Sequence, residues 1–372
     1  MATTVTPIEQ SRLFRAKFTY AVRRVPRKAM ATLVTGKLEP KAGDLILARV
    51  DRVRQHPRVE LCHGRKSKLF LGDEIVVCYG YRYAPDQFEA AVPDDLKPCH
   101  LVAGGGIAGR MLSRHASVKP PTEITPLGLL GDAQGRPLNI GDYKLPLRVM
   151  SGPRPPLLTV VGTSMNSGKT TTAAFLIRGL VRYGLKVGGV KITGTGAGGD
   201  LWCMLDAGAM PVLDIVDAGL PSTCRRSFEE LDGVADLLIS HLQAAGVDVI
   251  VMEIADGIYQ EETAGLLSLP AFTQKLDGVL FAALDAVGAT AGADWLARRG
   301  LPLLGISGVF TSSPLGMREA QAFTGVPALT SKALQCPSIA HSLIADILAR
   351  RGALKSAPVV QAVPAALSNL SG

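Results

Sequence analysis

Two hydrophobic patterns alternate along the second half of the chain. Short runs rich in Val, Leu and Ile predict strands at 157–162, 186–191, 212–216, 248–253, 278–284 and 302–309. Between these runs, apolar positions recur at helical spacing, which predicts helices at about 168–183, 200–209, 227–244, 289–299 and 336–351. Nearly continuous apolar strands that alternate with helices are typical of a parallel sheet covered on both faces. We therefore predict an α/β fold with a doubly wound, mostly parallel sheet.

The first 150 residues follow a different pattern. Short β-type runs, such as 44–50 and 74–79, are separated by turn residues at Gly72-Asp73 and Pro85-Asp86. This pattern predicts a smaller β-rich domain, either a barrel or a sandwich, over residues 1–150. The α/β domain would then span 151–352 after a Pro-rich linker, and residues 353–372 would form a poorly ordered tail.

Charge is distributed unevenly over these two regions. Residues 1–155 hold 25 Lys and Arg against 14 Asp and Glu, whereas residues 156–372 hold 15 against 18. The basic side chains cluster near the start of the chain, at Arg12, Arg15, Lys17, Arg23, Arg24, Arg27 and Lys28. Such a cluster could attract a polyanion, but we favour a solvated basic surface.

The apolar runs, the first residues and the cysteines together predict where in the cell the protein is found. No apolar run approaches the roughly 18 residues that a membrane span needs, and the first residues lack the features of a secretory signal. The six cysteines form no Cys-x-x-Cys pair, which indicates reduced thiols. We expect a cytoplasmic protein that does not contact the membrane.

The segment after the strand at 157–162 carries the strongest chemical signal. It reads Gly162-Thr163-Ser164-Met165-Asn166-Ser167-Gly168-Lys169-Thr170-Thr171, and a helix follows. Loop amides and a helix N-terminus bind anionic oxygens, a lysine reaches the outer phosphates, and a hydroxyl binds Mg²⁺. In the usual motif, G-x-x-x-x-G-K-S/T, four residues separate the two glycines, whereas five separate Gly162 from Gly168. Thr163 therefore occupies the position of the first glycine. The predicted nucleotide-binding residues are Gly162, Thr163, Asn166, Ser167, Gly168, Lys169, Thr170 and Thr171.

Two further strand ends carry charged groups suited to phosphoryl transfer. The strand at 248–253 ends in Glu253, with Asp256 three residues later, and the strand at 186–191 ends in Lys191. A carboxylate there would anchor Mg²⁺, and a second lysine would stabilise charge on the transferred group. We predict Lys169, Lys191 and Glu253 as catalytic residues and Thr170, Glu253 and Asp256 as metal ligands.

The loops that follow these strands supply candidates for substrate contacts. They are Thr193, Asp200, Ser222, Thr223 and Arg225. Asp200 could instead cap the next helix, and Ser and Thr clusters are also ordinary loop chemistry. Asp285 and the segment 307–311 are candidates for the side that binds the base. The glycine-rich run 104–110 predicts a turn, or a backbone surface that closes over the nucleotide site.

The loop resembles that of dethiobiotin synthetase and its relatives, the cobyrinic acid a,c-diamide synthases and the molybdopterin-guanine dinucleotide biosynthesis adaptor proteins. The shared features are Gly162-Thr163 spaced ahead of Gly168-Lys169-Thr170, Lys191 before Thr193-Gly194, and Glu253 before a small-residue loop. The resemblance covers roughly residues 157–310. It implies a P-loop NTPase fold that uses ATP and Mg²⁺. Ser164 replaces that family's usual aspartate and also the extra lysine of partitioning ATPases, which argues against their lysine-sharing dimer.

Three functions compete on these observations. The first is an ATP- and Mg²⁺-dependent enzyme, a kinase or ligase, that transfers the γ-phosphoryl group to a small-molecule acceptor. The second is a nucleotide-dependent adaptor or switch with slow hydrolysis, although the chain has no Asn/Thr-Lys-x-Asp segment for reading guanine. The third is a polynucleotide kinase, supported only by the basic N-terminal residues. A nucleic-acid partner is thus the weaker alternative, and a homodimer stays open.

Overall fold

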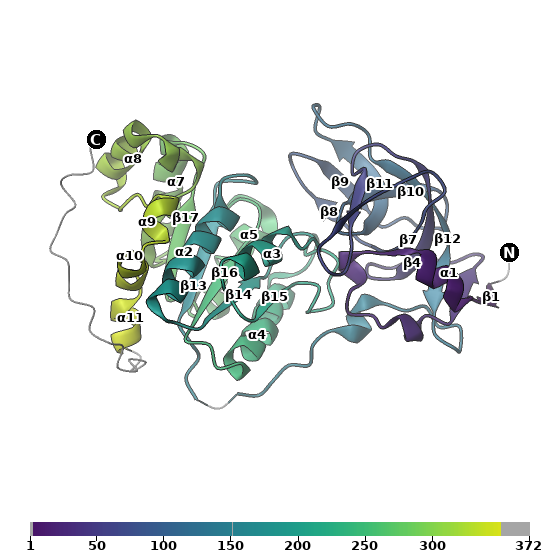
Figure 1. Ribbon diagram of the computed structural model, residues 1–372. Helices are drawn as coiled ribbons and strands as arrows, with labels where there is room; N and C mark the ends of the chain where they lie inside the picture. Colours follow the sequence, from purple (N-terminus) through teal and green to yellow (C-terminus); the bar gives the residue numbers. More distant parts are fainter. Residues whose placement is uncertain (1–2, 151, 351–372) are drawn as a thin grey trace.

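A computed structural model describes residues 3–150 and 152–350, so the predicted tail at 353–372 lies outside the described residues. Figure 1 shows two bodies side by side, a β-rich one built from the first part of the chain and an α/β one built from the rest. The predicted fold class, an α/β sheet preceded by a smaller β-rich domain, is confirmed. None of the described helices combines the length and apolar character needed to cross a membrane.

The β-rich body contains twelve strands and little helix within the described residues. Its strands are β1 (Thr4–Pro7), β2 (Lys17–Phe18), β3 (Thr32–Thr35), β4 (Leu45–Arg52), β5 (Arg58–Glu60), β6 (Lys66–Lys68), β7 (Glu74–Tyr79), β8 (Arg82–Tyr83), β9 (Phe88–Ala91), β10 (Cys99–Ala103), β11 (Ile107–Arg114) and β12 (Thr122–Gly131). Its helical turns are α1 (Gln10–Arg15), η1 (Tyr20–Val22), η2 (Arg27–Ala29) and η3 (Ile140–Tyr143).

Five of these strands close into a small barrel. Strands β12, β4, β7 and β11 pair in that order, and β10 pairs with both β11 and β12. Alternate residues of β4 enter different clusters: Ile46 and Ala48 pack in one, and Leu45 and Leu47 pack in the other. Because a strand's side chains point to opposite faces, β4 is buried on both sides. The chain that wraps the barrel, including α1 and η1, covers its second face.

The α/β body has a six-stranded parallel sheet with the strand order β15-β14-β16-β13-β17-β18. The strands are β13 (Leu157–Gly162), β14 (Val187–Lys191), β15 (Val212–Asp214), β16 (Val249–Glu253), β17 (Gly278–Ala282) and β18 (Leu303–Ser307). The helices are α2 (Lys169–Tyr183), α3 (Gly199–Asp206), α4 (Phe228–Ala244), α5 (Glu261–Leu266), α6 (Pro270–Thr273), α7 (Ala286–Ala297), η4 (Val309–Ser312), α8 (Pro314–Thr324), α9 (Ser331–Leu334), α10 (Pro337–Ser342) and α11 (Ala345–Arg350).

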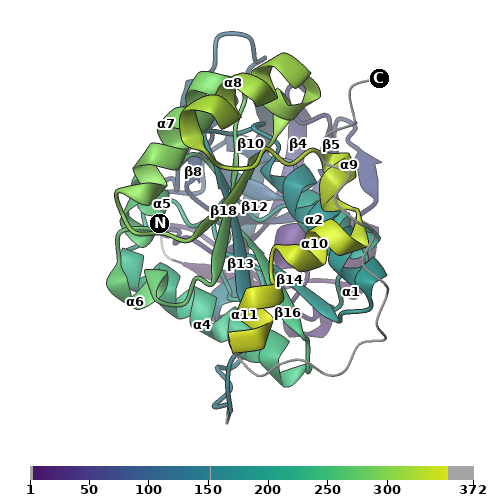
Figure 2. The same cartoon turned by 90° about the vertical axis from the view of Figure 1, so that its left-hand side faces the viewer.

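Helices cover both faces of this sheet, as Figure 2 shows. Leu157 and Val161 of β13 pack with α4 and α7, whereas Leu158 and Val160 pack with α2 and α10. All six predicted strands are present. The predicted helix at 336–351 is wrong in one respect, because α10 and α11 are separate helices. A turn at 343–344 divides them and places Ile344 in the core.

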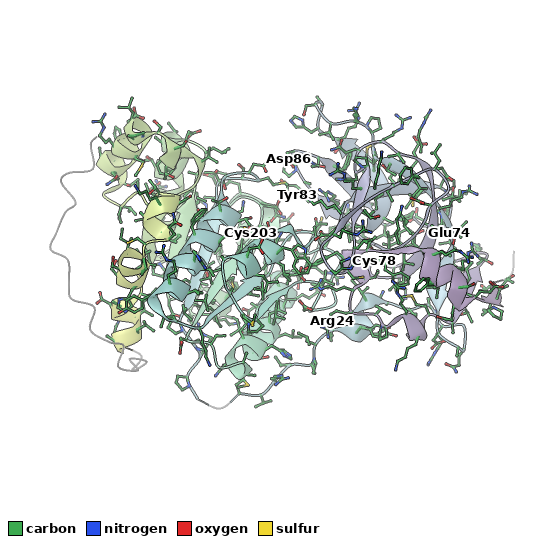
Figure 3. The ribbon with its side chains drawn as sticks, in the orientation of Figure 1. Arg24, Glu74, Cys78, Tyr83, Asp86 and Cys203 are labelled. Carbon is green, nitrogen blue, oxygen red and sulfur yellow. The ribbon has the colours of Figure 1, made fainter. Side chains whose placement is uncertain are left out.

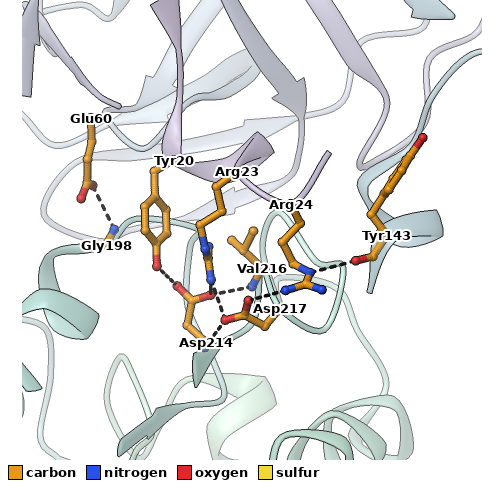
Figure 4. Close-up of polar contacts among 9 residues, drawn as sticks. All are labelled: Tyr20, Arg23, Arg24, Glu60, Tyr143, Gly198, Asp214, Val216 and Asp217. Carbon is orange, nitrogen blue, oxygen red and sulfur yellow. Dashed lines mark hydrogen bonds and ion pairs between the residues drawn. The ribbon is translucent and has the colours of Figure 1, made fainter. Parts of the chain in front are cut away.

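A buried polar cluster joins the two bodies at the end of β15 (Figure 4). The hydroxyl of Tyr20 donates to Asp214 at 2.5 Å, and the guanidinium of Arg23 contacts Asp214 and Asp217 at 2.7 and 2.6 Å. Arg24 adds a contact to Asp217 at 3.2 Å. The expectation of a solvated basic surface is therefore wrong for these two arginines, because carboxylates of the second body neutralise them. These contacts fix the barrel against the strand ends of the sheet.

Candidate functional site

The loop between β13 and α2 has the form that its sequence predicts. Asn166 and Gly168 take left-handed backbone angles, with φ of 61° and 96°, and α2 begins at Lys169. No side chain caps the helix N-terminus, and its first turn contains no acidic residue. A Cβ atom at Gly162 would lie 2.5 Å from the carbonyl oxygen of Ala282. The positive end of α2 is thus directed at a tight loop, which is an arrangement suited to anions.

Lys169 and Thr170 lie in the first turn of α2. The ammonium of Lys169 donates to the carbonyl oxygen of Ser164 at 2.7 Å, and burial lowers the pKa of this lysine. The Thr170 hydroxyl lies 2.8 Å from a carboxylate oxygen of Asp200 and 3.0 Å from one of Glu253. Because a hydroxyl carries a single proton, it cannot donate fully to both carboxylates.

The carboxylates around Thr170 carry charge that the surrounding protein compensates only in part. Asp200 forms an ion pair with Lys191. Glu253 is 2% exposed, and its second carboxylate oxygen has no hydrogen-bond partner among the described residues. Burial and the charge of Asp200 raise the pKa of Glu253 to about 7. The single proton of Thr170 cannot satisfy both carboxylates. The oxygens of Asp200, Glu253 and Thr170 are therefore better placed to bind a divalent cation than to hydrogen-bond to one another.

The oxygen atoms of Thr170, Asp200 and Glu253 are of a kind that fits Mg²⁺. This ion accepts one or two protein carboxylates and keeps several waters in its coordination shell. Within residues 3–150 and 152–350, no three His, Cys, Asp or Glu side chains are grouped closely enough to hold a metal by themselves. Asp256, the third predicted ligand, takes a left-handed φ of 61° and lines the same cavity, and burial raises its pKa. A cation here would thus need water or phosphate oxygens as further ligands.

A cavity of about 500 Å³ contains these groups. One wall consists of Lys169, Thr170, Lys191, Glu253 and their neighbours in the α/β body. The other wall comes from the β-rich body, at Arg82 and Tyr83 of β8 and at Ala84. Figure 3 shows Tyr83 and Asp86 on the side of the barrel that faces the second body. The side-chain amide of Asn166 donates to Asp86 at 2.7 Å, which holds the barrel against the loop.

A second cavity of about 410 Å³ adjoins the first across Gly168 and Thr171. It is lined by Gly308, Val309 and Thr311 of the segment predicted for base binding, together with Lys332 from α9. Asp285, the other candidate for this side, instead accepts a hydrogen bond from Gly288 and caps α7. The loop after β18 therefore lies where the rest of a nucleotide could extend.

Of the five predicted substrate contacts, only Asp200 lines the main cavity. It does not cap α3, because its carboxylate is bound to Thr170 and Lys191. Thr193 accepts from the Ala255 amide, and Thr223 accepts from the Gly194 amide. Ser222 accepts from the Cys224 amide, and Arg225 stacks on Tyr81. These four residues hold the loops in place around the cavity.

The sequence indicates that the N-terminal domain takes part in the site, but it does not indicate which of its side chains line this cavity. Arg82 and Tyr83 lie just before the Pro85-Asp86 turn, in a segment without a motif. The glycine-rich turn between β10 and β11 was expected near the site, and it packs against the loop after β14. A Cβ atom at Gly105 would overlap the carbonyl oxygen of Gly196. No sequence pattern marks which barrel residues meet the loop, because only the docking of the two bodies decides it.

The loop 162–171 joins a central strand of the parallel sheet, β13, to α2 and places Lys169 and Thr170 in the first helical turn, which indicates the fold. The second body has a P-loop NTPase fold. No family model matches the chain, and no curated protein matches it. Solved structures that resemble it include the signal recognition particle receptor FtsY from Elizabethkingia anophelis in complex with GDP, at 16% identity and a TM-score of 0.37, covering 53% of this chain and 66% of that one.

The 54 kDa signal recognition particle protein from Aeropyrum pernix K1, in complex with GDP, matches at 24% identity and a TM-score of 0.36, covering 57% of this chain and 52% of that one. Chloroplast FtsY from Physcomitrella patens matches at 15% identity and a TM-score of 0.36, covering 55% of this chain and 70% of that one. The first two matches span less than two thirds of those chains. The narrower resemblance to dethiobiotin synthetase gains no support from these matches.

Proposed function

We propose that this protein is a nucleotide-dependent switch that binds a Mg²⁺–nucleoside triphosphate on the loop 162–171 and hydrolyses it slowly. The observation that carries the proposal is the position of the short helix α3. At its start, Asp200 contacts Thr170 and Lys191 in the cavity. Two residues later, the Trp202 indole donates to Glu60 of the β-rich body and packs edge-on against Tyr20 at 5.9 Å. Any shift of Asp200 on nucleotide binding would move Trp202 against the barrel.

The charges of the other groups in the cavity, and their positions around it, suggest a role for each. Lys169 and the amides at the start of α2 would bind the phosphates, and Lys191 would offset charge that develops on the terminal group. Thr170, Glu253 and Asp200 would hold Mg²⁺ with water, with Asp256 as a further ligand. Bound there, Mg²⁺ would neutralise charge between the outer phosphates. We propose ATP as the nucleotide, since the chain has no guanine-reading segment.

The switch is tested by measuring nucleotide binding and interface movement together. Binding of fluorescent ATP and GTP analogues, with and without Mg²⁺, would be compared between the wild type and Lys169→Ala. We expect Mg²⁺-dependent binding in the wild type and its loss in the variant. In a Trp295→Phe background, Trp202 is the only tryptophan, so its emission should differ between the ADP- and ATP-analogue complexes. Unchanged binding in Lys169→Ala would refute the site, and identical emission would refute the switch.

A second candidate function is transfer of the terminal phosphate to a small-molecule acceptor. A third cavity of about 390 Å³ shares Tyr83, Met165 and Asp256 with the main one, and it is large enough for a metabolite. Turnover that rises several-fold with one compound from a metabolite panel, with the phosphate recovered on that compound, would favour transfer over switching. Turnover that no compound alters would favour the switch.

A further inference from the structure

Arg82 of β8 is buried in the main cavity, and no carboxylate within residues 3–150 and 152–350 forms an ion pair with it. The residue is 8% exposed and lines the cavity with Lys169 and Thr170. Its Nε has no hydrogen-bond partner among the described residues, and none of its side-chain nitrogens forms an ion pair there. The acidic groups that influence it, Asp86 and Asp256, act only over longer range.

Arg23, whose side chain is 13% exposed, shows what is missing at this position. Arg23 lies between Asp214 and Asp217, and both contacts are shorter than 2.8 Å. A buried cation without such a partner is costly, because the long-range attraction of Asp86 and Asp256 offsets only part of the hydration that it has lost. Burial lowers the pKa of Arg82 to about 10, so its guanidinium still carries charge near neutral pH. The site therefore favours an anion in direct contact with Arg82, which the described residues do not supply.

The position of Arg82 indicates which part of a nucleotide could supply that anion. Arg82 lines the cavity that holds Lys191 and Asp256, and it is absent from the lining of the second cavity, where the loop after β18 lies. The charge of Arg82 also acts on Asp256, as does that of Lys169. Arg82 therefore stands at the end of the site where the chain of phosphates would terminate. The bond between Asp86 and Asn166 holds the turn after β8 against the phosphate loop.

We propose that Arg82 is a catalytic residue that binds the terminal phosphate of the nucleotide from the barrel side. The inference rests on the proposed function and adds to it a contact made by a triphosphate and lost by a diphosphate. In hydrolysis, a water oxygen bonds to the terminal phosphorus while the bond from phosphorus to the bridging oxygen breaks. The electron pair leaves with the diphosphate, and the water proton passes to the released phosphate. A planar guanidinium binds two oxygens of the terminal group while its charge redistributes.

The test compares nucleoside triphosphate with diphosphate in the full-length protein. The variants are Arg82→Gln, which removes the charge, and Arg82→Lys, which keeps the charge without the planar fork. The matched control is Arg49→Gln, an exposed barrel arginine whose side chain is 51% accessible. Calorimetry would give the affinities for ADP and for a non-hydrolysable ATP analogue, and single-turnover assays would give the rate of hydrolysis.

We expect Arg82→Gln to weaken binding of the ATP analogue about 10- to 100-fold, the loss typical of a charge-assisted hydrogen bond, while ADP affinity stays the same. Hydrolysis should slow by at least as much, and Arg82→Lys should lie between. The Tm without nucleotide should stay unchanged or rise, because an unpaired buried charge is removed. Equal losses for both nucleotides, or no loss for either, would overturn the inference.

The outcomes separate this inference from the function on which it rests. If the wild type binds no nucleotide, the proposed function itself fails. If Lys169→Ala loses binding while Arg82→Gln keeps the wild-type preference for triphosphate, only the role of Arg82 fails. A fall in Tm of Arg82→Gln with that preference intact would assign Arg82 a structural role and would also overturn the inference.

Discussion

Removal of the Arg23 side chain should loosen the barrel from the α/β body. In Arg23→Met, the aliphatic part of the side chain is kept and the guanidinium is lost. Asp214 and Asp217, whose side chains are only 2% and 8% exposed, would then lose their shared counter-ion. Two carboxylates would be left close together with less positive charge between them. The variant therefore tests whether this cluster holds the two bodies together.

The free energy lost in Arg23→Met depends on which partners Asp214 and Asp217 would keep. Breaking a buried ion pair by removing one member typically costs about 3–5 kcal/mol. Asp214 would keep the Tyr20 hydroxyl at 2.5 Å, and Asp217 would keep Arg24 at 3.2 Å. These contacts place the loss near the lower end, at about 3 kcal/mol. A loss of that size weakens the association of the two bodies about 100-fold.

Trp202 provides the measurement, because its indole contacts Glu60 and Tyr20 of the barrel. In a Trp295→Phe background, denaturant titrations would follow Trp202 emission and far-ultraviolet circular dichroism in parallel. We expect Arg23→Met to move the Trp202 transition to lower denaturant, ahead of the loss of secondary structure. Arg49→Met, which alters an exposed barrel arginine, should leave both transitions in place. If Arg23→Met also leaves both unchanged, the cluster does not hold the bodies together.

Three further predictions concern the site, acid stability and close packing. Glu253→Gln should keep nucleotide affinity within a few-fold but reduce Mg²⁺-dependent hydrolysis about 100-fold; equal rates would make Glu253 structural. Burial lowers the pKa of His56 to about 4. The unfolded chain protonates this imidazole below about pH 6.5, whereas the folded chain does so only near pH 4, so the free energy of unfolding should fall by up to about 3 kcal/mol between pH 6.5 and 4. In Tm measurements, His56→Asn should flatten this dependence on pH. An unaltered slope would show that His56 is not its source. Gly105→Ala should lower the Tm because its Cβ would overlap the Gly196 carbonyl oxygen, whereas Gly233→Ala on open helix surface should raise it slightly; equal shifts would contradict this packing.

Local sequence was enough to predict the second body and to predict that the residues at the centre of the candidate site lie together. The strand at 157–162 and the helix that follows were predicted to within a residue, because buried parallel strands and amphipathic helices impose distinct periods. Lys169, Thr170, Lys191 and Glu253 were also expected together. In a parallel sheet, neighbouring strands place their carboxyl ends at one edge, so strand-end residues meet there.

Other site assignments depended on contacts that the sequence could not rank. Asp200 could have capped α3, and only the approach of Thr170 and Lys191 decides that its carboxylate lies in the cavity. Ser222 and Thr223 have the composition of a ligand loop, but their hydroxyls accept from backbone amides and hold the loop instead. A short polar side chain suits both tasks, and its neighbours select one of them.

The sequence by itself determined the P-loop body, because the loop 162–171, the strand pattern and the strand-end charges are encoded within short segments. Only the tertiary structure decided how the barrel takes part. Arg82 enters the cavity, Arg23 is neutralised at Asp214, and Asp86 holds Asn166 across more than 70 residues of intervening chain. The physical reason is that a cation's role depends on which charges surround it after two surfaces have docked. An arginine can therefore lie in solvent, form a structural ion pair as Arg23 does, or line a cavity as Arg82 does, according to that docking.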